Sequence, residues 1–365
     1  MKKFISAVLV SAMMLTLLGS CQSGGGSSTA SESGTSSESS VSSSESSEES
    51  SEAPSESSEE ASSGAEKLGV EMNIAFLKGP TGLGALELMD ANDKGETAVD
   101  YNISLVASAD EIVSGIGSGE YDLAAAPTNL GSTLYNKTSG GVSIVAINTL
   151  GVLYVLEKGD VAVSTVEDLR GMDIIASGEG STAEYVLDYI LSENGIDPET
   201  DVNITYYTEH AEAATALASA ENAVAVLPQP FVTTVMNQDE GISIALDLTD
   251  EWEKVTDGAQ LVMGSIIGRN EYIEANPEAV SAFLDEYAAS TDFVNNSVEE
   301  AAALSESYDL FPAAVASKAI PNCNIVFMEG EEMKTSAESF LQVMYDYEPS
   351  TVGGTLPGDD FYFAR

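Results

Sequence analysis

Apolar residues recur at two different spacings in the chain after residue 70. Met72, Ile74 and Phe76 occupy every second position, which predicts a strand, and a turn containing Gly79 and Gly82 follows. After that turn the apolar residues recur at helical spacing, at Leu83, Leu86 and Met89. Further strands are expected over 102–106, 122–126 and 142–147, with helices over 109–116 and from 129. Strands that alternate with helices predict an α/β fold in which helices cover a parallel sheet.

The same succession of strand, polar loop and helix starts again near residue 164. A short capped turn over 164–170 precedes an expected strand over 172–176, and a polar loop then leads into a helix that Gly195 ends. Ser181 and Glu184 have the spacing of a capping box at that helix start. Later expected elements are strands over 204–206, 223–227 and 261–267, a helix over 211–219, and helices that begin near 276, 297 and 331. The pattern therefore indicates two similar α/β lobes.

The N-terminus has the layout of a bacterial lipoprotein leader. Lys2 and Lys3 precede an apolar run over 4–18 that is too short for a comfortable membrane span. The run ends in Leu18-Gly19-Ser20-Cys21, which resembles a lipobox, so residues 1–20 are expected to be a signal peptide. On this interpretation Cys21 carries the lipid (palmitate) anchor, and the protein lies on the extracytoplasmic face of a bacterial cell membrane. An ordinary signal peptide with an incidental cysteine is the alternative.

Residues 21–67 are nearly all Ser, Glu, Gly, Ala and Thr. Such a segment buries too little apolar surface to offset its ordering entropy, so we expect a disordered tether between the membrane and the folded part.

Only one other cysteine, Cys323, is present in the sequence. Because a lipid-bearing Cys21 offers no partner for a disulfide, Cys323 is expected to be a buried apolar residue. The sequence contains no CxxC motif or Cys/His cluster, so we predict neither a metal site nor a cofactor.

The formal net charge of −47 at pH 7 excludes several partner classes. So acidic a chain repels the phosphates of nucleic acid and the surface of an anionic membrane. A soluble acidic exterior is the simplest interpretation, and we expect a monomer that touches the membrane through its anchor alone.

The glycine-rich turn at 79–82 raises the question of a nucleotide site. A P-loop requires Gly-Lys-Ser/Thr after a wider glycine frame, but here Lys78 precedes the glycines. A dinucleotide fingerprint requires a third glycine where Glu87 stands. Both nucleotide motifs fail, and a helix start remains whose free N–H groups are expected to point into a cleft.

Two longer stretches carry a resemblance to a known family. They are STVEDLRGMDIIASGEGSTAEYVLDYILSENGIDPETDVNITYY over 164–207 and NPEAVSAFLDEYAASTDFVNNSVEEAAAL over 276–304. They resemble solute-binding proteins of the nitrate/sulfonate/taurine type, which serve ABC importers and have the type II periplasmic-binding-protein fold. The resemblance covers the chain after Leu68 and implies two lobes, each with a mixed, mostly parallel sheet and flanking helices. It does not name the ligand.

The family implies that the chain crosses twice between the lobes, near 151–155 and near 261–264. Lobe 1 would then comprise 68–152 plus 263–365, and lobe 2 would comprise 153–262. A small solute would be captured between them and delivered to an ABC permease with its ATPase.

Candidate ligand contacts come from loops at the carboxyl ends of predicted strands, where open α/β sheets bind ligands. The expected ligand-binding residues are Lys78, Gly79, Pro80, Thr81, Gly82, Thr128, Asn129, Thr149, Gly180, Ser181, Thr182 and Gln229. Two helix starts that face one small volume favour a carboxylate, sulfonate, nitrate or phosphate-like group. We therefore expect bulky residues at Gly82 and Ser181 to abolish binding and leave folding intact.

The charge of the cleft leaves the ligand class open. Only Lys78 is a cation on the predicted rim, whereas a strongly anionic ligand often meets an Arg fork. A small anion, a sulfonate and a heterocycle therefore remain alternatives. Four aromatic residues could stack on a ring or simply belong to the core: Tyr154, Tyr206, Tyr207 and Phe231.

Two other function classes stay open. Enzymes related in fold include menaquinone-pathway dehydratases and a pyrimidine-forming synthase, but the chain has a single histidine, His210. We expect His210 to be a surface residue at a helix start, so we predict no catalytic residue, although Glu179 and Glu209 leave a paired-carboxylate site open. A ligand sensor that works without a transporter is the second alternative.

Overall fold

The computed structural model describes residues 66–365. The predicted signal peptide, Cys21 and the tether up to residue 65 lie outside the described residues.

The first sheet has six strands in the order β11-β4-β10-β3-β1-β2. Its strands are β1 (Glu71–Leu77), β2 (Asp100–Val106), β3 (Leu123–Pro127), β4 (Val142–Leu150), β10 (Val262–Arg269) and β11 (Ile325–Met328). β1 pairs in parallel with β2 and β3, whereas β10 runs antiparallel to both β3 and β4, and β11 antiparallel to β4. β1 to β4 therefore share one direction, and β10 and β11 run against it.

The second sheet has five strands in the order β7-β6-β8-β5-β9. Its strands are β5 (Leu153–Lys158), β6 (Asp173–Ser177), β7 (Asn203–Tyr207), β8 (Ala223–Pro228) and β9 (Ile242–Asp247). β6 is parallel to β7 and β8, and β5 is antiparallel to β8 and β9, so β5 alone is reversed. The prediction of mixed, mostly parallel sheets is confirmed for both sheets.

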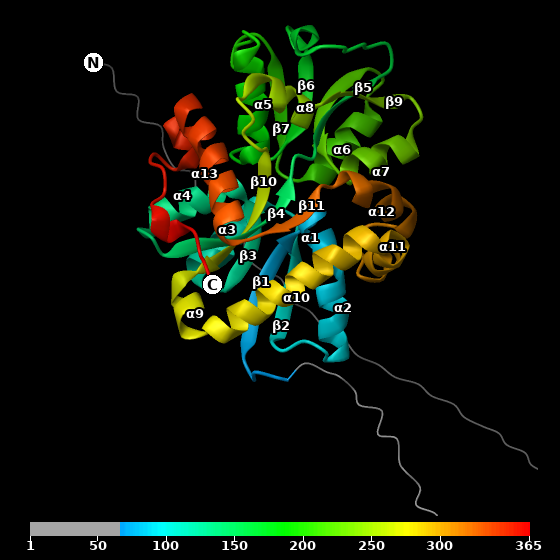
Figure 1. Cartoon of the computed structure of the whole chain (residues 1–365). Coiled ribbons are helices and arrows are strands. Elements are labelled where there is room, and N and C mark those ends of the chain that lie inside the picture. Colours follow the sequence, from blue (N-terminus) through cyan, green and yellow to red (C-terminus); the bar gives the residue numbers. More distant parts are fainter. Residues whose placement is uncertain (1–65) are drawn as a thin grey trace, which may run out of the picture. The chain divides into compact units, whose positions relative to one another are not determined.

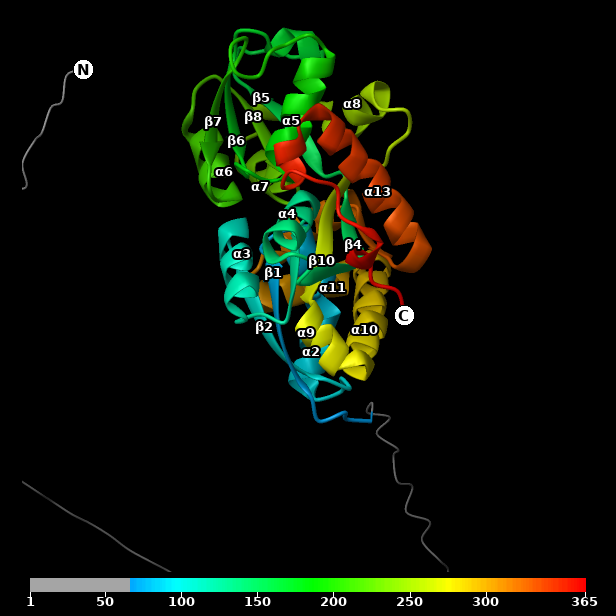
Figure 2. The ribbon, with the colours of Figure 1, turned by 90° about the vertical axis from the view of Figure 1, so that its left-hand side faces the viewer.

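We call the first sheet and its helices lobe 1, and the second sheet and its helices lobe 2; Figure 2 shows them one above the other. The chain leaves the first sheet after Leu150 and enters the second at Leu153. It returns to the first sheet as β10, which begins at Val262. β5 and β10, the first strand after each passage, are both reversed, which explains why neither sheet is fully parallel.

Helices flank both sheets (Figure 1). Lobe 2 carries α5 (Thr182–Glu193), α6 (His210–Ser219), α7 (Phe231–Gln238) and α8 (Leu248–Val255). The others are α1 (Pro80–Gly84), α2 (Leu86–Lys94), α3 (Ala109–Ser118), α4 (Thr128–Thr138), α9 (Asn270–Ala275), α10 (Pro277–Asn296), α11 (Val298–Ser307), α12 (Ala313–Ala319) and α13 (Gly330–Tyr347). The predicted capped turn is confirmed as a 3-10 helix over Val166–Leu169, in which Thr165 and Asp168 cap each other.

Local sequence patterns located most of these elements but not all. The single helix expected after Gly82 is two helices, because Ala85 adopts φ −94° and ψ 0° and its N–H donates to carbonyls in the preceding turn. The sequence patterns did not reveal β5, β9, β11, α7, α8, α9 or α12. β11 and α9 are only four and six residues long, too short to show a period.

The C-terminal helix α13 packs on both lobes. Phe340 on α13 lies against Trp252 of lobe 2, with ring centroids 5.6 Å apart. At its end Tyr347 meets Tyr189 on α5 at 5.7 Å, with its plane nearly perpendicular to that of Tyr189. One apolar core thus continues from lobe 1 through α13 into lobe 2.

Cys323 is fully buried and free, as expected, and burial raises the pKa of its thiol. Within residues 66–365 no helix has the length and apolar character needed to cross a membrane.

Candidate ligand-binding site

A cavity of about 80 Å³ lies where the carboxyl ends of strands from both sheets meet, and we call it the inner cavity. Lobe 1 contributes the ends of β1, β3 and β4, and lobe 2 contributes the end of β8 and the start of α5. The two passages between the lobes complete the wall, at Val152–Leu153 and Met263–Gly264. A second cavity of about 260 Å³, the outer cavity, shares Leu77, Pro127, Ser181 and His210 with it.

Residues 77–81, the lobe 1 turn, line the inner cavity after β1. α1, which follows, has five residues, carries Pro80 in its first turn and has no side-chain cap. Thr81 donates its hydroxyl proton to the carbonyl oxygen of Leu77 at 3.0 Å. Lys78 is exposed, and it forms no ion pair with any described residue.

Residues 178–183, the lobe 2 turn, lead from β6 into α5 and are held by their own hydrogen bonds. Ser181 Oγ accepts the N–H of Ala183 at 3.3 Å and donates to the carbonyl of Gly178 at 2.5 Å. The Glu184 carboxylate accepts the N–H of Gly180, one residue before the position that a capping box requires. The predicted cap at Ser181 is therefore present, but its reciprocal bond is displaced, and a carboxylate already occupies the start of α5.

A direct hydrogen bond joins the lobes beside the inner cavity. Thr182 Oγ1 donates to Asn129 Oδ1 at 2.9 Å, and Asn129 N–H donates to Thr182 Oγ1 at 3.4 Å. The side-chain Nδ2 of Asn129 donates to the carbonyl oxygen of Thr351 at 3.1 Å. Asn129 and Thr182 are buried, so their polar atoms satisfy each other across the two lobes.

The structure brings most of the predicted ligand residues to the two cavities. The inner cavity is lined by Lys78, Gly79, Pro80, Thr81, Thr149, Ser181 and Thr182, and the outer cavity by Gly180 and Ser181. Four predicted residues line neither: Gly82, Thr128, Asn129 and Gln229.

Each of these four residues is hydrogen-bonded to, or packed against, other parts of the protein. Thr128 Oγ1 lies 2.8 Å from Ser265 Oγ, and Gln229 Oε1 accepts the hydroxyl proton of Thr233 at 2.8 Å at the start of α7. Gly82 is buried, and a Cβ there would lie 2.9 Å from the carbonyl oxygen of Leu77. The expectation that a bulky residue at Gly82 would leave folding intact is therefore wrong.

His210 is the main residue that the sequence interpretation misplaced. It begins α6, as expected, but it lines both cavities and is only partly exposed. Its Nδ1 lies 2.7 Å from Ser177 Oγ, its ring packs on Phe231, and burial lowers its pKa to about 4. The signal that could have found it is its place directly after the carboxyl end of β7, the rule that found the other loops.

The four aromatic residues considered for stacking line neither cavity. Tyr154 and Phe231 are buried, and Tyr206 and Tyr207 pack at the margin of the apolar clusters. Glu179 lines the outer cavity, whereas Glu209 lines neither cavity. Within residues 66–365 no group of three or more side chains is arranged to hold a metal ion.

Solved structures share this architecture. An ABC transporter protein from Parabacteroides distasonis is 22% identical, with a TM-score of 0.66, over 81% of this chain and 99% of that one. The alkanesulfonate-binding protein SsuA from Xanthomonas axonopodis pv. citri, bound to MOPS, is 15% identical with a TM-score of 0.64 over 79% and 95%. The periplasmic aliphatic sulphonate-binding protein SsuA from Escherichia coli is 16% identical with a TM-score of 0.64 over 80% and 92%.

The fold is that of the type II periplasmic-binding proteins. Residues 94–256 match the family described as ABC transporter, phosphonate, periplasmic substrate-binding protein. The type II fold that the resemblance implies is thereby confirmed, and the family match over residues 94–256 agrees with the resemblance to solute-binding proteins of ABC importers. A search of curated proteins finds no match.

Proposed function

We propose that the chain is a membrane-anchored, extracytoplasmic solute-binding protein that captures a small molecule between its lobes and delivers it to an ABC importer. The observation that carries this proposal is the inner cavity, whose wall comes from the carboxyl ends of strands in both sheets. A ligand held there would touch both lobes, so binding would favour the closed arrangement in which Asn129 and Thr182 meet.

The similar proteins support the same function. The matching family is described by its role in ABC transport, and the Xanthomonas relative binds a small molecule, MOPS, on this fold. We propose an ABC permease and its ATPase as partners and no catalysis, with lobe limits at 68–152 plus 263–365 and 153–262. Lipid attachment at Cys21, the extracytoplasmic membrane location and a monomeric state complete the proposal.

The test is a native mass spectrum of the purified full chain before and after mild unfolding. A solute-binding protein is expected to release a small molecule on unfolding. The variant Gly79→Leu should release none, because Gly79 lines the inner cavity and a Cβ there meets only open space. Gly117→Leu is the matched control, since Gly117 is exposed near the end of α3, lines neither cavity, and its Cβ also meets open space.

If wild-type chain releases no small molecule and none of a broad solute panel raises its melting temperature, capture of a solute is rejected. If a solute is bound, but a strain that lacks the permease encoded next to this protein still responds to that solute, the protein is a sensor rather than an importer's receptor.

The anchor has a separate test. Cys21→Ser is expected to move the protein from the membrane fraction to the soluble fraction, because the thioether that carries the lipid cannot form. Membrane-bound Cys21→Ser protein would reject the lipobox interpretation.

A further inference from the structure

We propose that the two cavities select a small molecule without net negative charge, and that His210 recognises its polar edge through Nε2. This inference rests on the capture function proposed above and narrows its ligand class. It sets this chain apart from relatives described by phosphonate and sulfonate binding.

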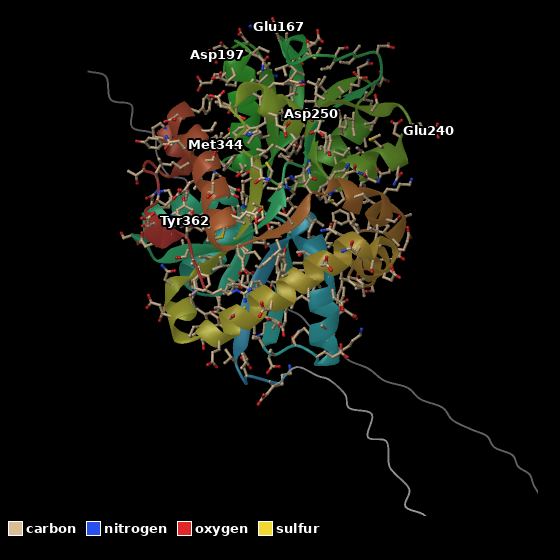
Figure 3. All side chains as sticks on the ribbon, viewed as in Figure 1. Glu167, Asp197, Glu240, Asp250, Met344 and Tyr362 are labelled. Carbon is tan, nitrogen blue, oxygen red and sulfur yellow. The ribbon has the colours of Figure 1, made fainter. Side chains whose placement is uncertain are left out.

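The charges around the cavities argue against an anion. Lys78 is the one cation in the described walls, and it is exposed, whereas the outer cavity is lined by the carboxylates of Asp110 and Glu179. Acidic side chains also cover the outside of lobe 2, among them Glu167, Asp197 and Glu240 in Figure 3. With a formal net charge of −47, the field of the protein lowers the local concentration of anions.

The helix starts at the cavity do not compensate for this field. α1 is a single short turn, so it provides little dipole. At α5 the Glu184 carboxylate already accepts the N–H of Gly180, so the protein supplies its own anion where a ligand anion would bind.

The hydroxyl groups that line the inner cavity donate their hydrogen bonds to other atoms of the protein. The acceptors are the carbonyl of Leu77 for Thr81, the carbonyl of Gly178 for Ser181, Asn129 Oδ1 for Thr182 and Asn148 Oδ1 for Thr149. Because a hydroxyl has one proton and two lone pairs, these groups offer acceptors to a ligand and no donors. An oxyanion needs donors, and the hydroxyls of this wall provide none.

His210 supplies the donor that the hydroxyls lack. Among the described residues Ser177 Oγ has one hydrogen-bond partner, His210 Nδ1. Because the proton of this buried hydroxyl would otherwise lack an acceptor, we assign it to Nδ1, which places the ring proton on Nε2. Nε2 has no protein partner in the described chain, and the ring stands where the two cavities meet. The low pKa of His210 keeps this ring uncharged at neutral pH.

The chain contains a single histidine, so its state can be read directly. In the full chain labelled with ¹⁵N-histidine, long-range proton–nitrogen spectra should show one neutral ring protonated at Nε2 from pH 6 to 8. A ring protonated at Nδ1, or one that gains a proton in this range, would overturn the assignment.

Dimethyl sulfone and methanesulfonate form a matched pair of probes, since they have similar shapes and differ by one negative charge. Dimethyl sulfone is expected to shift the His210 signals at a concentration at least tenfold lower than methanesulfonate. His210→Phe should weaken dimethyl sulfone binding about tenfold, whereas His210→Gln, which keeps an N–H donor, should weaken it less.

Three outcomes overturn the inference. Methanesulfonate or methylphosphonate that binds more tightly than dimethyl sulfone would refute the charge selection while the capture function stands. His210 signals that no probe moves would refute the role of His210. A purified chain that releases no small molecule and meets no ligand in the solute panel would remove the capture function itself.

Discussion

The lobe 1 turn and the lobe 2 turn occupy equivalent places, each between a strand end and a helix at the inner cavity, but they are built differently. The lobe 1 turn leads into a five-residue helix that no side chain caps. The lobe 2 turn leads into a twelve-residue helix in which Ser181 caps the N–H of Ala183, and the Glu184 carboxylate accepts the N–H of Gly180 just before the helix. Equivalent positions in the two sheets therefore do not provide equivalent anion sites.

This difference shows why a helix start is weak support for a ligand's charge. Free N–H groups attract an anion only when the protein has not already supplied one. The acidic residue Glu184, three positions after the cap, supplies it in lobe 2. The capping spacing of Glu184 from Ser181 in the sequence predicts a cap, and the same carboxylate also occupies a donor that a ligand anion would need.

The largest expected effect is the difference in stability between substitutions at Gly82, beside the lobe 1 turn, and at Gly79, within it. Gly82→Ala should lower the free energy of unfolding by about 3 kcal/mol, because its Cβ would press on the backbone oxygen of Leu77, which cannot rotate away. Gly79→Ala should change it by less than about 0.5 kcal/mol, since nothing lies near its Cβ. Urea unfolding of the two variants measures the contrast, and equal stabilities would contradict the buried position of Gly82.

The next effect concerns the bond that joins the lobes. Thr182→Val keeps the side-chain volume but leaves Oδ1 and the backbone N–H of the buried Asn129 without their partner, which should cost the closed form about 2 kcal/mol. The population of the closed form should fall, and ligand affinity with it, by about tenfold or more. Small-angle scattering should report a larger radius of gyration.

Thr149→Val is the matched control, because Thr149 lines the same cavity but bonds to Asn148 within its own lobe. If both variants scatter alike, the Asn129–Thr182 bond does not hold the lobes together.

Local sequence patterns predict the strand ends and loops of the site, but they do not predict the contacts that form when the two lobes close on each other. Strand ends and the loops after them were located from periodicity, and this placed Lys78 to Thr81 and Gly180 to Thr182 at the cavities. Asn129 and Thr182 were both named as ligand contacts, yet they contact each other across 53 positions of sequence. No local pattern encodes such a pairing, because it exists only once two separately folded sheets approach.

A smaller effect tests the cap of the lobe 2 turn. Ser181→Ala removes the acceptor for the N–H of Ala183 and should lower the free energy of unfolding by about 1 kcal/mol. Ser297→Ala, before α11, should cost less than half of that, because Ser297 makes no side-chain cap bond. Thermal unfolding of both variants measures the two losses of stability. A larger loss for Ser297→Ala than for Ser181→Ala would show that Ser181 does not act as a cap.

The last effect is confined to one pH range and comes from the acidic surroundings of α5 behind the lobe 2 turn. Burial, with Glu184, Glu348 and Glu199 nearby, raises the pKa of Asp188 to about 7, against about 3.9 in an unfolded chain. Between these values the folded protein binds more protons than the unfolded one, so this group's contribution to stability falls as pH rises from about 4 to 7. Asp188→Asn should therefore raise the free energy of unfolding by about 1 kcal/mol at pH 8 and by almost nothing at pH 4. The gain at pH 8 is only this large because partial exposure screens the charge of Asp188.

Urea unfolding at the two pH values, with the exposed Glu193→Gln on the same helix as control, measures the difference. A gain at pH 4 equal to that at pH 8 would mean that the charge of Asp188 costs the fold nothing, and that the lobe 2 turn differs from the lobe 1 turn in its caps alone.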